Sequence, residues 1–170
     1  MQRRAVRLTL LALFLLAGLS AASVAWDVYS RGREGFIIER EVDARLDRMS
    51  ADAAALWAAQ QAYVAPGQQR GEALTRASVL VQQLYDDTSV LRTRARAPGA
   101  PTALLAFGET VDALVVVDDR VREHLGDDEE LMAADLVYTE ARQIVGAMAS
   151  QLGELKALEM GFASDERRAL

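Results

Sequence analysis

The sequence predicts an all-α protein, with a single N-terminal transmembrane helix followed by an up-down-up-down antiparallel four-helix bundle. Three observations support this fold class. An uncharged apolar run of 19 residues lies near the N-terminus, later apolar residues recur at spacings of three and four, and no alternating strand pattern occurs. We divide the chain into a basic start with its anchor (1–28), an extracytoplasmic bundle (29–165) and a short tail (166–170).

The anchor extends from Leu8 to Trp26, which at about 1.5 Å per residue is enough to cross the bilayer core. Three arginines precede it and Asp27 follows it, so the positive-inside rule places the N-terminus in the cytoplasm. We therefore expect a single-pass protein of a bacterial inner membrane with its bundle in the periplasm. The expected membrane-interface residues are Arg3, Arg4, Arg7, Trp26 and Tyr29.

A cleaved signal peptide is the alternative interpretation of this segment. A basic start, an apolar core and the small residues Ser23, Val24 and Ala25 also fit a secretory leader. We favour an uncleaved anchor, because the uncharged run is long enough to span a membrane. The chain contains no Cys, which excludes a lipoprotein.

The first bundle helix is expected from about Tyr29 to Ala65, ending at Pro66-Gly67. Its seam of a and d positions comprises Val42, Leu46, Met49, Ala53, Leu56, Gln60 and Tyr63. A second seam comprises Leu74, Ala77, Val81, Leu84, Thr88, Leu91 and Ala95, and ends at the turn Pro98-Gly99-Ala100-Pro101. Polar seam residues such as Gln60, Thr88 and Gln151 are expected to set the register.

The third and fourth helices flank Gly126, which is expected as the residue just after a helix end. The third seam comprises Leu104, Phe107, Val111, Leu114, Val121 and Leu125. Asp127 and Glu130 then have the spacing of a capping box. The fourth seam comprises Ala134, Val137, Ala141, Ile144, Met148, Gln151, Leu155, Leu158 and Phe162. Four segments joined by short connections predict a four-helix bundle.

The composition argues against most kinds of catalytic and metal-binding site. The absence of Cys excludes disulfides, thiolate nucleophiles, Cys-ligated zinc and iron–sulfur clusters, and a single His excludes any site that needs two imidazoles. The net charge of −6 disfavours nucleic acid as a partner. We therefore expect no enzyme activity, cofactor or metal site. His124 is interpreted as an exposed residue near a helix end, and the pairs Asp86-Asp87 and Asp118-Asp119 as exposed faces.

Five side chains are candidate partner contacts. Trp57 and Tyr63 lie beside or on the first seam, where a core role is the alternative, and aromatic residues are enriched at protein interfaces. Arg92, Arg94 and Arg96 cluster at the end of the second helix, where cations complement the helix dipole. The alternative for these arginines is contact with an anion, lipid phosphates or an acidic partner.

This order of segments resembles the four-helix-bundle sensor domains of methyl-accepting chemotaxis receptors and related histidine kinases. A short basic start, a membrane helix and a heptad-patterned bundle follow one another over nearly the whole chain. The resemblance implies a ligand-sensing domain, but such receptors continue with a second membrane helix and a cytoplasmic output domain. The sequence shows neither after Ser164, so we expect no route for a signal across the membrane through this chain.

The sequence therefore predicts a non-catalytic accessory or scaffolding subunit. Its bundle is expected to dock on and stabilise a larger membrane protein complex, such as a photosynthetic or respiratory assembly, while residues 8–26 contact the lipid bilayer. The alternative is the ligand-sensing domain of a chemoreceptor-like or histidine-kinase-like protein, and only this alternative implies a small-molecule ligand.

Overall fold

The computed structural model describes residues 37–65, 67 and 69–169. The chain divides into two compact units, Met1–Arg40 and Glu41–Leu170. Of the first unit only residues 37–40 are described, and they are helical. The predicted anchor at 8–26 and its expected interface residues lie outside the described residues; these residues are Arg3, Arg4, Arg7, Trp26 and Tyr29.

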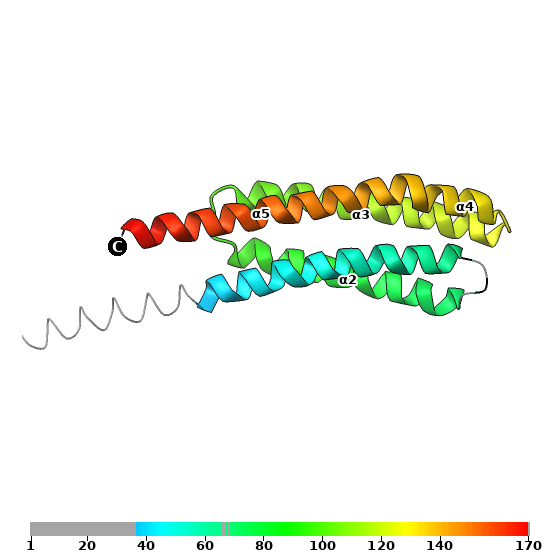
Figure 1. The fold of residues 1–170 in the computed structure, drawn as a ribbon, viewed down its shortest axis with the longest axis horizontal. Coiled ribbons are helices and arrows are strands. Elements are labelled where there is room, and N and C mark those ends of the chain that lie inside the picture. Colours follow the sequence, from blue (N-terminus) through cyan, green and yellow to red (C-terminus); the bar gives the residue numbers. More distant parts are fainter. Residues whose placement is uncertain (1–36, 66, 68, 170) are drawn as a thin grey trace, which may run out of the picture. The chain divides into compact units, whose positions relative to one another are not determined.

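The second unit is built of helices, and the described residues contain no strand. Helical residues run over 37–64, and α2 (Arg70–Arg94) and α3 (Ala100–Gly126) follow. A long final stretch combines α4 (Glu130–Leu136), the π-helical turn η1 (Val137–Ala141) and α5 (Arg142–Ala169), as Figure 1 shows. The prediction of an all-α protein is confirmed.

Helix α3 occupies a central place in this unit, because it packs against α2, α4, η1 and α5 (Figure 1). It is also the one helix among the described residues that is long and apolar enough to cross a membrane. Length and composition are the only basis for that statement, and a core helix of a bundle has the same properties. This helix is not the predicted N-terminal anchor.

Two of the four predicted seams match the core closely. All seven seam residues of the first helix are buried, from Val42 to Tyr63. All six predicted seam residues of α3 are buried as well, from Leu104 to Leu125. In both helices a strict alternation of four and three places one stripe of side chains against the neighbouring helices.

The seam of α2 is partly wrong. Ala77, Leu84, Thr88 and Leu91 are buried as expected. The predicted positions Leu74, Val81 and Ala95 are only half-buried. The core also contains three residues that the seam omits: Ala73, Leu80 and Asp87. The buried face of α2 is therefore wider than a strict a and d stripe, as in a helix that packs against more than one neighbour.

The seam of the last helix departs from the prediction only after Met148. Val137, Ala141, Met148 and Leu155 are buried as predicted, and Ile144 is half-buried. Further on, the predicted Gln151, Leu158 and Phe162 are replaced in the core by Leu152, Glu159 and Ala163. The buried residues from Met148 to Ala163 are mostly four apart. A straight α-helix has 3.6 residues per turn, so its buried face drifts away from a strict stripe of alternating threes and fours.

The turns lie close to the predicted positions, with one difference in detail. Residues 95–99 connect α2 to α3, and Gly67 has the positive φ of 78° expected in a tight turn. Gly126 is the last residue of α3 rather than the residue after it, and Asp128 has a φ of 61° instead. The N-cap of α4 is Glu129, without a side-chain cap, so the predicted capping box of Asp127 and Glu130 is wrong.

Candidate functional site

Asp118, a buried carboxylate of α3, bonds directly to the first helix and, through Arg122, is linked to α2. Only 7% of Asp118 is exposed, and its Oδ1 accepts hydrogen bonds from the Tyr63 hydroxyl and from Gln60 Nε2 at 3.2 Å. Its Oδ2 accepts a hydrogen bond from Arg122 Nε at 2.6 Å. Arg122 also donates to the Ser78 hydroxyl at 3.2 Å, which links this group to α2. The expectation that Asp118 lies on an exposed face is wrong.

Tyr63 and Gln60, which bond to Asp118, are buried as well. Desolvation, with the Asp118 carboxylate as the second cause, raises the pKa of Tyr63 above its usual range. Gln60 Oε1 is buried and has no hydrogen-bond partner among the described residues. Tyr63 is 1% exposed, so the expectation that it is an exposed partner contact is also wrong. Its role is to hold Asp118 in the core.

A second buried carboxylate, Asp87 of α2, faces the first helix. Its Oδ1 lies 2.5 Å from Arg45 Nη1 and 3.8 Å from Arg48 Nη1. Asp52 is close enough for Asp87 to affect it, and desolvation followed by Asp87 raises the Asp52 pKa. Asp86 is exposed but Asp87 is buried, so the exposed-face prediction fails for one residue of each acidic pair.

Glu159 of α5 binds the turn between α2 and α3. Its carboxylate accepts hydrogen bonds from the backbone N–H groups of Arg96 and Ala97, each at 2.9 Å. Arg96 in turn pairs with Glu166, and its guanidinium lies 5.5 Å from the centre of the Phe162 ring. Arg96 therefore fastens α5 to the turn and is not a free cation.

The remaining predicted contact residues lie at or near the surface. Arg92 and Arg94 are exposed, and no ion pair to another described residue involves either of them. Trp57 is half-buried, and its indole N–H has no hydrogen-bond partner among the described residues. The structure thus places Arg92, Arg94 and Trp57 where a partner can reach them, but it does not bring the five predicted residues together.

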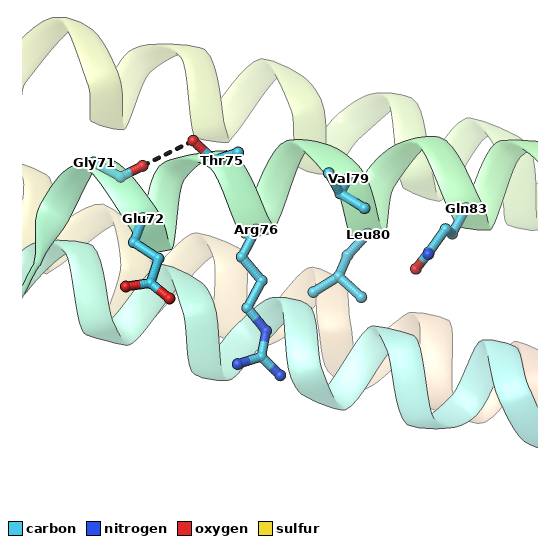
Figure 2. Close-up of a pocket in the computed structure, with 7 residues that line it drawn as sticks. All are labelled: Gly71, Glu72, Thr75, Arg76, Val79, Leu80 and Gln83. Atoms are coloured by element: carbon cyan, nitrogen blue, oxygen red, sulfur yellow. Dashed lines mark hydrogen bonds between the residues drawn. The ribbon is translucent and has the colours of Figure 1, made fainter.

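Two open hollows border α2. The larger, about 660 Å³, is lined by Gly71, Glu72, Thr75, Arg76, Val79, Leu80 and Gln83, and Figure 2 shows these side chains along one helix. The smaller, about 390 Å³, shares Glu72 and Arg76 and is lined by alanines of the first helix. No ion pair joins Arg76 to another residue in the described part of the chain.

Three apolar side chains at the start of the last helical stretch are exposed, and one of them, Leu131, is the most exposed large apolar side chain of the described residues. Leu131 is 88% exposed, Met132 56% and Tyr138 50%. We call Leu131, Met132 and Tyr138 the α4 ridge. On a helix, residues seven apart share one face, so Leu131 and Tyr138 lie along the same outer line. The opposite face holds the buried Ala133, Leu136 and Val137.

Acidic side chains surround the α4 ridge. Asp127 and Asp128 precede it and Asp135 lies within it, and all three are exposed. No hydrogen bond or ion pair joins these three carboxylates to another described side chain, whereas Glu129 bonds to His124 and Glu130 to Arg70. His124 lies in the last turn of α3, as predicted, but it is half-buried rather than exposed and pairs with Glu129 at 2.6 Å.

The described residues contain no group of three or more His, Cys, Asp or Glu side chains arranged to hold a metal ion. Comparison of the chain with protein-family models, with curated proteins and with solved structures gave no match.

Sequence reasoning missed Asp118, Glu159 and Leu131. The signal for Asp118 was present, because the third seam passes from Leu114 to Val121 and the a and d spacing places a residue at 118. Glu159 was missed because the predicted stripe leaves the buried face after Leu155. Leu131 lies outside the last seam, and its large exposure is visible only in the structure.

Proposed function

We propose that this protein is a non-catalytic, single-pass membrane subunit whose periplasmic up-down-up-down bundle docks on and stabilises a larger membrane complex. The observation that supports this proposal best is the α4 ridge. Its most exposed member, Leu131, is 88% exposed, although the neighbouring Ala133 and Leu136 are buried. Fully burying one such side chain contributes about 1.5–3 kcal/mol, so the ridge supplies binding energy when a partner covers it.

The buried charges support a role as a rigid scaffold. Asp118 and Asp87 each need partners on a second helix, Tyr63 and Arg45 respectively. Because an unpaired buried carboxylate is costly, only one alignment of these helices satisfies both groups. A bundle held in one alignment presents its outer surface at fixed positions, which lowers the ordering cost of docking.

The predicted anchor completes the proposal. Residues 8–26 cross the membrane with the N-terminus in the cytoplasm, and the bundle follows them on the periplasmic side. Sequencing the N-terminus of the protein purified from membranes tests this part directly. A chain that starts at Met1 or Gln2 supports the anchor, and a chain that starts at Trp26 contradicts it.

Deletion of the gene tests the docking role. We expect a membrane complex to become smaller or less stable on native gels, while its core activity per complex persists. A full-length copy restores the complex. Unchanged size and stability of all membrane complexes in the deletion strain would contradict the proposal.

A ligand sensor is the second candidate, and the hollows along α2 favour it. Arg76 and Glu72 border both hollows and offer one cation and one anion to a small ligand (Figure 2). A ligand that binds only the folded state raises its melting temperature by mass action. We expect no such rise with a panel of amino acids and organic acids, and a clear rise would favour the sensor.

A further inference from the structure

We infer that the α4 ridge receives a basic amphipathic helix of the partner protein, with apolar side chains covering Leu131 and Tyr138 and Lys or Arg side chains facing Asp127, Asp128 and Asp135. This inference rests on the proposed docking function and names the chemistry of the partner. An exposed apolar line on a helix is the surface against which a second apolar stripe packs.

The carboxylates around the α4 ridge favour a partner with positive charge. Asp127, Asp128 and Asp135 are exposed, and none pairs with a cation in the described part of the chain. A cation placed beside them gains attraction, and an acidic partner is repelled. Arg142, four residues after Tyr138, is an exposed cation, and no ion pair joins it to another described residue. The acidic surface is therefore confined to the beginning of the last helical stretch.

The same charges disfavour two other occupants. An anionic bilayer surface is repelled by three free carboxylates. A second copy of the chain, facing ridge to ridge, brings the same carboxylates together. A cationic helix meets neither obstacle, and its apolar face covers side chains that are otherwise left in water.

Two features keep the ridge in place for this role. The buried Ala133, Leu136 and Val137 fix α4 and η1 against the core, and both elements pack on α3. Arg70 of α2 pairs with Glu130 at 2.5 Å, and Arg120 of α3 pairs with Glu140 at 2.9 Å. The ridge is thus held from both sides by neighbouring helices, with Leu131 pointing outward.

The test uses the full chain in nanodiscs of zwitterionic lipid and a fluorescent helical peptide about four turns long. The peptide has leucines on one face and lysines on the other, and its control has the same leucines with glutamates in place of lysines. Anisotropy measures binding, and empty nanodiscs give the lipid background. We expect saturable binding of the lysine peptide, weakened by salt, and at least tenfold weaker binding of the glutamate peptide.

Substitutions locate the site. Leu131→Asp should weaken binding of the lysine peptide about tenfold or more. Leu105→Asp is the matched control, since Leu105 is 56% exposed but lies near the opposite end of α3, and it should bind as the wild type does. Replacing Asp127, Asp128 and Asp135 together by Asn should reduce both affinity and salt dependence, and Asn tolerates the positive φ of Asp128.

Three results would overturn the inference: equal binding of the two peptides, unchanged binding by Leu131→Asp, or an equal loss in Leu105→Asp. Self-association of the chain that Leu131→Asp abolishes would identify a second copy as the occupant and would also overturn it. If the peptides fail to bind while gene deletion still shrinks a membrane complex, the partner chemistry is wrong and the proposed function stands.

Discussion

Substituting Arg122 by Met tests the buried polar group of the core most sharply. Arg122 Nε donates to Asp118 at 2.6 Å, and its Nη2 donates to the Ser78 hydroxyl at 3.2 Å. Met keeps much of the apolar stem of the side chain and removes the charge. Asp118, which is 7% exposed, then keeps Tyr63 and Gln60 as donors but loses its cation.

The size of the effect follows from the burial of the two partners. Breaking a fully buried ion pair costs about 3–5 kcal/mol. The Arg122 side chain is 33% exposed, so water screens the pair, and two neutral donors remain on the carboxylate. We therefore expect a loss of about 2 kcal/mol of unfolding free energy, which is about 1 M in the urea midpoint for an m value of about 2 kcal/mol/M.

Arg120→Met is the matched control for this measurement. Arg120 lies two residues away on α3, and its bond to Glu140 joins two half-exposed side chains. Such exposed pairs contribute about 0–1 kcal/mol, so this variant should unfold close to the wild-type midpoint. Equal midpoints for Arg122→Met and Arg120→Met would refute the argument that the Asp118 group stabilises the core.

The other predictions concern the core, the turn and the alkaline limit of stability. Leu84→Asp places a charge at a fully buried position and should abolish cooperative unfolding by urea, whereas Ile144→Asp, at a half-buried position, should only lower the midpoint. Glu159→Ala leaves two backbone N–H groups without acceptors and should cost about 1–3 kcal/mol, whereas Glu154→Ala, at an exposed position on the same helix, should cost little. The pKa of Tyr63 is raised in the folded state, so its contribution is complete below about pH 10 and is lost as pH rises further. Tyr63→Phe should therefore lose less stability than the wild type between neutral and strongly alkaline pH in thermal melts.

The sequence was most informative where the heptad pattern is uninterrupted. In the first helix every seam residue, from Val42 to Tyr63, is buried, because the alternation of four and three continues without a break to the turn. After η1 the predicted Gln151 and Leu158 are replaced in the core by Leu152 and Glu159. A straight α-helix drifts from the heptad stripe over several turns, and the spacing alone does not show how far the buried face drifts in this helix.

The candidate site was less predictable than the fold. Tyr63 and Arg96 were expected to contact partners. Instead, Tyr63 bonds to the buried carboxylate of Asp118, and Arg96 pairs with Glu166 of α5. Each of these contacts joins residues more than fifty positions apart, and such pairs cannot be read from local spacing. Leu131 lies outside the seam, but so do other exposed apolar residues such as Leu105 and Val116, and its 88% exposure could not be predicted from spacing.

Purification of the full-length protein from the membrane fraction of its cells tests the central claim most directly. Tagged wild type, Leu131→Asp and Leu105→Asp are extracted in mild detergent, and the co-purifying proteins are identified and their stoichiometry measured. We predict that one membrane complex accompanies the wild type and Leu105→Asp in stoichiometric amounts and is lost or greatly reduced with Leu131→Asp. A wild-type protein that purifies without any stoichiometric partner, and whose melting temperature rises clearly with a small ligand, would contradict the account.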